Sequence, residues 1–236
     1  MYFWQVHPNK NKRTAPAAVC IQNTLDSPVP DLLPLFCWPE PAYLARLVLQ
    51  GQNTFEPGFP FWRASGMNRF YLLDARGAVR YTLPLEGGRN HPRTLGAAVL
   101  QAPEQWALAH WKRIENTYRR APYFEYLGPT AKALFAKPEP KLMDYSLHAL
   151  AWIMNLLDLP LGMPVSLEAT DSSQAQDLLR RTRNAAPLLE EAPEYYQHFG
   201  DKTGFVPHLS TLDLLFQCGP RESRRYLDAL IPLVAP

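Results

Sequence analysis

The sequence has few residues of the kinds that cross-link a fold or bind a metal. Its 236 residues include three cysteines, Cys20, Cys37 and Cys218, and no two of them form a C-x-x-C pair. Zinc knuckles and thioredoxin-type redox motifs are therefore not indicated. The H-E-x-x-H motif is absent, and the six histidines are never spaced four residues apart. We expect no metal site, and three scattered thiols are typical of a reducing, cytoplasmic compartment.

Long apolar runs and a strong net charge are also missing. No stretch reaches the ~18 apolar residues that a membrane-spanning helix needs. Residues 1–8 are followed by basic residues between positions 10 and 13, which reverses the order found in a secretory signal. The net charge of +2 gives no long-range attraction to nucleic acid or anionic lipid. We expect a soluble chain with no membrane span and no nucleic-acid partner.

The local motifs of several large enzyme classes are absent as well. There is no G-x-x-x-x-G-K-[ST] and no G-x-G-x-x-G, so the usual phosphate-binding loops are missing. The G-x-S-x-G turn of serine hydrolases is absent too. Many enzymes carry no local motif, so the reaction, the cofactor and the oligomeric state are left open.

The composition that remains is that of a packed protein. Hydrophobic residues make up 47% of the chain and charged residues 19%, which favours a folded core over disorder. The 24 prolines lie between periodic segments and punctuate them. Residues 1–30 lack periodicity and are predicted to form an extended arm. The globular domain is predicted to span residues 31–236.

The pattern predicts an α/β fold in one domain, with a mixed sheet from the N-terminal half and a helix-rich C-terminal half. The strongest β signal is a hairpin, because two β-rich runs flank Ala75-Arg76-Gly77. The strands are predicted at residues 32–37, 52–56, 69–74, 78–83 and 165–169. The helices are predicted at residues 39–49, 103–119, 129–137, 141–158, 173–183, 211–218 and 220–230.

Two helices carry informative faces. Trp111 lies on an apolar face with Ala107, Ile114 and Tyr118, which predicts burial. Helix 141–158 carries a narrow polar seam formed by Asp144, His148, Asn155 and Asp158. That seam either lines a cleft or is the solvated face of the helix, and the second interpretation is favoured.

The segment from Ser210 to Asp213 has the spacing of a capping box. Its hydroxyl and carboxylate can serve the first N–H groups of a helix, or they can serve a ligand. Capping is the favoured interpretation for both residues. Gly219-Pro220 then marks the end of this helix and the start of the last one.

Three segments of the sequence have residue patterns that are specific enough to suggest a protein family. The first begins at Gln105-Trp106 and continues through His110-Trp111 to Tyr118-Arg119-Arg120-Ala121-Pro122-Tyr123-Phe124. The second runs from Tyr195-Tyr196-Gln197 to Gly204-Phe205-Val206-Pro207-His208-Leu209-Ser210. The third follows at once, as Thr211-Leu212-Asp213-Leu214-Leu215-Phe216 with Gly219.

These segments resemble the WbqC-like family, bacterial proteins named after a component of O-antigen gene clusters. The pattern Y-x-x-A-P-Y-F and the pattern F-x-P-x-L-S-x-x-D-L-L-F-x-x-G are its most recognisable features, and the Tyr-Tyr-Gln resembles a subgroup common in Bacteroidota. The resemblance covers roughly residues 32–230. It implies a setting in surface-polysaccharide metabolism and supplies no reaction mechanism.

The front half departs from the family pattern. The N-terminal turn of the family, of Pro-aromatic-Leu-Pro type, is best matched by Phe36-Cys37-Trp38-Pro39-Glu40-Pro41, and its basic strand is reduced to Met67-Asn68-Arg69. A Tyr-Leu-Ser-Gly-like segment of typical members is absent. If the N-terminal turn holds the ligand, the family's activity does not carry over to this chain automatically.

The leading functional hypothesis is a transferase that acts on an activated sugar, with a nucleotide sugar or another small molecule as its ligand. His110 is the candidate acid/base, although His110 and Arg113 also fit an ordinary helix edge. The aromatic residues fit a sugar site or an ordinary core. The predicted ligand-binding residues are Asn68, Arg69, Arg113, Tyr118, Tyr123, Tyr196, Gln197 and Asp213. The alternative is a non-catalytic binding or scaffolding protein, which is favoured if His110, Asn68 or Arg69, and Tyr196 do not share one concave site.

Overall fold

The computed structural model describes residues 31–51, 53–61, 64–87, 94–159 and 192–234. The predicted arm over residues 1–30, the strand at 165–169 and the helix at 173–183 lie outside these residues. No helix in the described ranges has the length and apolar character needed to cross a membrane.

The N-terminal part of the fold is a small βαβ unit. Strand β1 (Asp31–Leu32) pairs in parallel with β2 (Asn53–Thr54), and helix α1 (Pro41–Gln50) connects them. The prediction of a strand over residues 32–37 is correct only at its start, because strand pairing ends at Leu32 and the chain bends at Cys37 and Trp38. Pro41 occupies the first turn of α1, where its missing N–H costs nothing.

The predicted hairpin is present. Strand β3 (Arg69–Asp74) pairs antiparallel with β4 (Gly77–Thr82), with Phe70 opposite Tyr81 and Leu72 opposite Val79. Residues Phe70, Leu72 and Tyr81 are buried, and Tyr71 and Arg80 are exposed. One face of the hairpin therefore packs against the helices. The other face exposes Tyr71 and Arg80 but buries Leu73 near its end.

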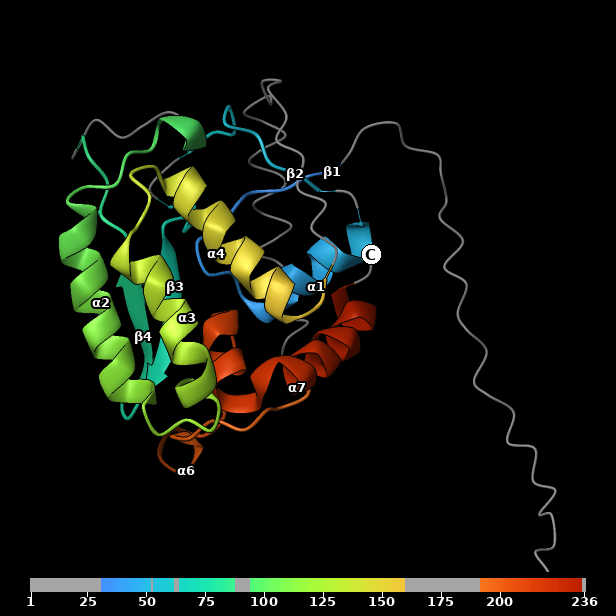
Figure 1. The fold of residues 1–236 in the computed structure, drawn as a ribbon. Helices are drawn as coiled ribbons and strands as arrows, with labels where there is room; N and C mark the ends of the chain where they lie inside the picture. Colours follow the sequence, from blue (N-terminus) through green and yellow to red (C-terminus); the bar gives the residue numbers. More distant parts are fainter. Residues whose placement is uncertain (1–30, 52, 62–63, 88–93, 160–191, 235–236) are drawn as a thin grey trace, which may run out of the picture.

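Helices form the rest of the described chain. They are η1 (Leu95–Ala97), a short 3-10 turn, followed by α2 (Pro103–Tyr118), α3 (Phe124–Ala136), α4 (Leu142–Leu156), α6 (Gly200–Thr203) and α7 (Thr211–Val234). Figure 1 shows α1 and α7 side by side on one side of the molecule and the β3–β4 hairpin with α2 on the other. The mixed α/β fold with a helix-rich C-terminal half is thus confirmed.

The predicted helix boundaries differ from the observed ones by a few residues, and the largest difference is at the start of α3. Helix α3 begins at Phe124, five residues before the predicted start at Pro129, and the proline lies inside it. The backbone N–H of Tyr123 donates to the carbonyl of Phe216 at 3.0 Å, which sets the start of the helix through a tertiary contact. Glu125 and Pro129 are exposed, so water can satisfy the carbonyl that the proline leaves without a donor.

Helix α7 is divided at Gly219, as the Gly-Pro pair predicts. Gly219 has φ 72° and ψ 172°, which is not helical. A Cβ on Gly219 would collide with the ring of Tyr123. Glycine is required here both for its left-handed backbone and for this close approach.

The apolar faces meet in one cluster of buried side chains. Trp111 is 5% exposed, stacks on Phe124 with the ring centroids 5.8 Å apart, and also contacts Phe135. The polar seam of α4 is exposed at each of its four positions, 144, 148, 155 and 158. The interpretation of that seam as the solvated face of its helix is therefore confirmed.

We expect Trp111→Ala to lower the free energy of unfolding by about 3–5 kcal/mol, because a large buried aromatic ring leaves a cavity. The matched control is Leu108→Ala on the same helix, where the side chain is 71% exposed and the loss should stay within about 0.5 kcal/mol. Denaturant unfolding of both variants measures the difference. Equal losses of unfolding free energy in the two variants would mean that α2 is rotated about its axis, with its apolar face turned away from the core.

Candidate functional site

The sequence-predicted acid/base, His110, lies in an aromatic surround on α2. Its ring contacts those of Phe70, Tyr81 and Trp106, with centroids 6.3, 5.1 and 5.4 Å away. Burial, with a smaller contribution from the charge of Arg113, lowers the pKa of His110 to about 4. The imidazole is therefore neutral at physiological pH, and it does not line the pocket described below.

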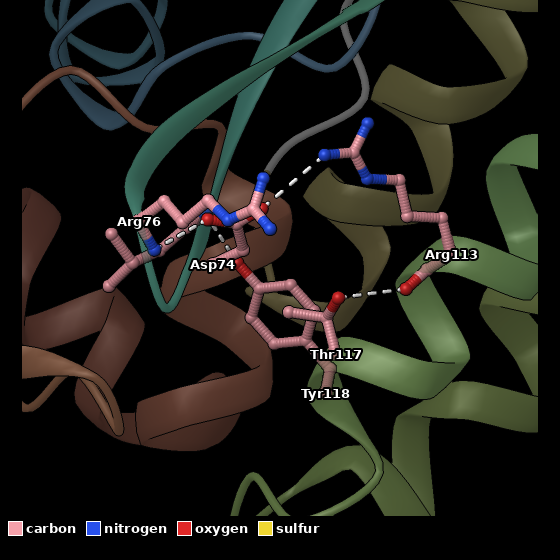
Figure 2. Close-up of polar contacts among 6 residues, drawn as sticks. Asp74, Arg76, Arg113, Thr117 and Tyr118 are labelled. Carbon is pink, nitrogen blue, oxygen red and sulfur yellow. Dashed lines mark hydrogen bonds and ion pairs between the residues drawn. The ribbon is translucent and has the colours of Figure 1, made fainter.

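Arg113 is held in a contact on the molecular surface. Figure 2 shows its guanidinium directed at Asp74, whose other oxygen accepts the backbone N–H of Arg76. The ion pair spans 3.3 Å, and the Arg113 side chain is 52% exposed. The guanidinium also lies over the ring of Tyr81, 5.4 Å from its centroid. Such an exposed pair contributes about 0–1 kcal/mol to stability.

Three further predicted residues make internal structural contacts. Asn68 is buried, and its side-chain Nδ2 donates to the backbone carbonyl of Leu83 at 2.8 Å. The backbone carbonyl of Asn68 accepts the N–H of Leu83. Gln197 clamps a loop, because its amide both donates to the carbonyl of Val206 and accepts the N–H of Val206, each at 2.9 Å. The ring of Tyr123 packs over Gly219. Tyr196, in contrast, is 61% exposed.

Tyr118 and Asp213 meet in the core. The hydroxyls of Tyr118 and Tyr195 donate to the two carboxylate oxygens of Asp213 at 2.5 and 2.6 Å. The Tyr118 hydroxyl in turn accepts the backbone N–H of Leu73 from β3 at 2.9 Å. Asp213 is fully buried, and burial raises its pKa to about 6 against the opposing effect of the two tyrosine hydrogen bonds.

The capping prediction is half correct. The Oγ of Ser210 accepts the N–H of Leu212 at 3.2 Å, which confirms Ser210 as the N-cap of α7. The prediction for Asp213 is wrong, because the Ser210 N–H donates to the carbonyl of Tyr71 and the Asp213 carboxylate binds the two tyrosines. A sequence pattern could not reveal these partners, which lie far away along the chain.

The predicted residues are therefore dispersed, and a different group surrounds the main pocket. That pocket has a volume of about 410 Å³, a size that suits a small molecule. Among the described residues, three chain segments line it: residues 36–46, residues 64–71, and the pair His208 and Ser210. Of the residues predicted from the sequence as ligand-binding, Arg69 is the one that lines it.

The walls combine aromatic rings with charges. Trp38, Tyr43 and Phe70 form buried parts of the wall, and Phe36 and Tyr71 are more open to solvent. The described residues that line the pocket and carry or can carry a full charge near neutral pH are Glu40, Arg46, Arg69 and His208. Such a lining can accept a planar or sugar ring together with an anionic group.

His208 and Glu40 form the polar pair at the junction of two segments. The Nδ1 of His208 lies 3.2 Å from Oε2 of Glu40, and both side chains are roughly 40% exposed. The hydrogen bond to Glu40 raises the pKa of His208 above its usual value, although partial burial opposes this. If Nδ1 carries the hydrogen, Nε2 is left to exchange a proton with a ligand, and it has no hydrogen-bond partner among the described residues.

The backbone at the pocket is strained at two positions. Trp38 has φ 50° and His208 has φ 62°, and left-handed backbone is uncommon for side chains of this size. Trp38 is held by a hydrogen bond from its Nε1 to the Tyr145 hydroxyl at 3.0 Å and by stacking on Phe135. Strain that the surrounding structure maintains is often found at binding sites.

Hydrogen bonds at the start of α7 join the pocket's three segments. The backbone N–H and the Oγ1 of Thr211 both donate to the carbonyl of Pro39, at 2.8 and 2.9 Å. The Ser210 N–H donates to Tyr71 on β3 at 2.8 Å. These bonds place His208, the turn before α1 that contains Glu40, and strand β3 around one cavity.

Sequence reasoning missed His208, Glu40 and Arg46. His208 lies within the motif quoted above, between Pro207 and Leu209, and Glu40 lies between two prolines in the divergent N-terminal turn. Their contact spans 168 positions along the chain. The divergent turn was the available signal, because it pointed to a segment in which a ligand would be held.

Metal ligation finds no support in the part of the chain that the structure describes, which contains no cluster of three or more His, Cys, Asp or Glu side chains arranged to hold an ion. Cys37 and Cys218 are free thiols. Cys37 lines the pocket but is fully buried, and burial strongly raises its pKa, so it is a poor nucleophile.

The fold is that of a helix-rich α/β protein, and its pocket is lined by aromatic and charged side chains. The chain belongs to the WbqC-like protein family, whose model matches residues 53–186. The matched range includes Arg69 and Tyr71 of the pocket and ends before His208. Comparison with curated proteins and with solved structures gives no match.

We expect Ser210→Ala to lower the free energy of unfolding by about 0.5–2 kcal/mol, because the first turn of α7 loses its cap. Ser210→Asp keeps a capping acceptor and is the matched comparison; denaturant unfolding measures both. If the alanine variant is as stable as the parent, the contact with the Leu212 N–H contributes nothing.

Asp213 should make stability depend on pH. Its pKa is about 6 in the folded protein and 3.8 as the reference for the unfolded chain, so the folded state retains a proton that the unfolded state loses. This contribution is fully present below pH 4 and is lost as pH rises through about 6. Relative to Asp213→Asn, the parent should gain about 2 kcal/mol between pH 7 and pH 4, where the unfolded chain is itself partly protonated.

Unfolding free energies measured at several pH values test this expectation for Asp213. Asp144→Asn is the control, because Asp144 is exposed on the solvated face of α4. The difference between the parent and Asp213→Asn should vary with pH, while the difference between the parent and Asp144→Asn should not. Parallel curves for all three proteins would show that the pKa of Asp213 is the same in the folded and the unfolded state.

Proposed function

We propose that this chain is a transferase that binds an activated sugar in its pocket, in the setting of bacterial surface-polysaccharide biosynthesis. The observation that carries the proposal is the His208–Glu40 pair beside Arg46 and Arg69 within one aromatic-walled pocket of small-molecule size. Family membership supports the setting. A cytoplasmic location, expected from the scattered thiols, is part of the same proposal.

Each side of the pocket has a role in this proposal. Arg46 and Arg69 attract the anionic group of the activated sugar, and guanidinium groups suit phosphate oxygens because their donors form a planar fork. The more open rings of Phe36 and Tyr71 offer faces against which the sugar ring can pack. His208 replaces His110 as the candidate acid/base, because it lines the pocket and has a carboxylate partner.

The alternative is a binding or scaffolding protein without catalysis. It is favoured by the dispersal of His110, Asn68 and Tyr196, which do not line the pocket. The two functions need the same ligand contacts and differ in turnover. A ligand that binds through Arg69 and is recovered chemically unchanged with every acceptor tested would select the alternative.

A thermal-shift panel of nucleotide sugars, acyl-CoAs and free nucleotides tests the proposal. At a concentration of about 100 Kd, a ligand that binds only the folded state stabilises it by about 2.7 kcal/mol. The melting temperature should then rise by roughly 5–10 °C. We expect a nucleotide sugar to give this shift and Arg69→Gln to abolish it.

Arg113→Gln is the matched control for Arg69→Gln, since it removes a partly exposed arginine that lies outside the pocket. It should leave the ligand-induced shift unchanged. A ligand whose shift survives in both Arg69→Gln and His208→Asn would place the binding site elsewhere on the protein and overturn the proposal.

A further inference from the structure

The net charge of the side chains that line the pocket depends on the protonation state of one of them, and this net charge decides which ligand charge the pocket balances. Arg46 and Arg69 supply two positive charges, and Glu40 supplies one negative charge. With His208 neutral, these described side chains sum to +1; with His208 protonated, they sum to +2. Protonation of one histidine therefore decides whether the lining balances a monoanion or a dianion.

His208 is placed to make that change. In the same pocket, α1 contributes Tyr43 and Arg46, β3 contributes Arg69 and Tyr71, and the turn before α1 contributes Cys37 and Glu40. Tyr195 and Tyr226 face it from the other side, where a smaller cavity is lined by both tyrosines together with Glu40 and His208.

Most of these neighbours keep one protonation state near neutral pH. Burial raises the pKa of Tyr226 to about 12 and moves those of Cys37, Tyr43 and Tyr195 further from neutrality in the same direction. Burial lowers the pKa of Arg46 from its usual value, and guanidinium groups are in general protonated in proteins. His208, whose pKa the hydrogen bond to Glu40 raises above its usual value, is accordingly the group in this surround whose charge can change with pH.

We propose that the pocket selects a diphosphate diester, the dianionic group shared by nucleotide sugars and coenzyme A derivatives, and that its binding is accompanied by uptake of one proton at His208. This inference rests on the proposed function and names the chemistry that the pocket recognises. A diester has no proton that titrates near neutral pH, so the pocket must supply the second compensating charge. A nearby dianion favours the protonated imidazole, which completes the +2 lining.

Isothermal titration calorimetry tests the inference with two probes, UDP-glucose and dephospho-coenzyme A. Both are diphosphate diesters without a titrating phosphate monoester, and they differ in their organic parts. Titrations at one pH in buffers of different ionisation enthalpy give the number of protons taken up. We expect net uptake for the parent and an affinity that rises as pH falls from 8 to 6. The probe that binds more tightly distinguishes the nucleotide sugar from the coenzyme A source.

His208→Asn should lose the proton uptake, flatten the pH dependence and bind the probe about tenfold more weakly at pH 6. Asparagine tolerates the left-handed backbone that position 208 requires, which favours folding of the variant. Glu40→Gln is the second variant. It keeps the histidine and removes its partner, so proton uptake should persist with its maximum moved to lower pH.

His148→Asn is the matched control. His148 forms a pair of the same kind with Glu139 at 3.3 Å, and this exposed pair lies outside the pocket. Its loss should leave both the affinity and the proton uptake as in the parent. If His148→Asn removed the uptake, the proton would be bound outside the pocket and the inference would fail.

The remaining outcomes separate this inference from the proposed function. Binding of a diester without proton uptake overturns the role of His208 and leaves the sugar-binding proposal intact. Binding of neither diester, when another panel ligand still depends on Arg69, overturns the diphosphate class alone. Failure of the whole thermal-shift panel overturns both.

Discussion

The start of α7 is the junction on which the pocket depends. Two hydrogen bonds from Thr211 to the carbonyl of Pro39, and one from Ser210 to Tyr71, join the C-terminal motif to the N-terminal turn and to the hairpin. Ser210 and Thr211 are buried, so these bonds are protected from competition with water. The N–H of Cys37 donates to the carbonyl of Met67 at 2.9 Å, which joins the N-terminal turn directly to residues 64–71, and the bonds from α7 add the segment that carries His208.

Asp213 strengthens this junction at an electrostatic cost. Its carboxylate is fully buried and binds two hydroxyls, with no cation bound to it among the described residues. Tyr118 extends the connection to β3 through the N–H of Leu73. A buried ionised group is expensive even when it is hydrogen-bonded, and the raised pKa of Asp213 expresses that cost. The network ties α2, α7 and β3 together and gives the fold a titrating group at its centre.

The two histidines of interest show how surroundings decide chemistry. His110 lies among aromatic rings, where burial lowers its pKa to about 4, so it packs as a neutral ring. His208 lies beside a carboxylate at the pocket, where its pKa is raised. Both residues occur in particular-looking segments of the sequence, and only their three-dimensional neighbours separate a core residue from a candidate proton carrier.

The sequence by itself determined the elements whose signals are local. The hairpin, the amphipathic face of α2 that buries Trp111, the solvated seam of α4 and the Ser210 cap follow from period, turn residues and capping chemistry. The sequence motifs of the WbqC-like family could also be identified without the structure. Tertiary structure decided the start of α3 and the partners of Asp213, because both depend on contacts between distant segments. It also assembled the pocket, since the contact of His208 with Glu40 crosses 168 positions and no local pattern encodes it.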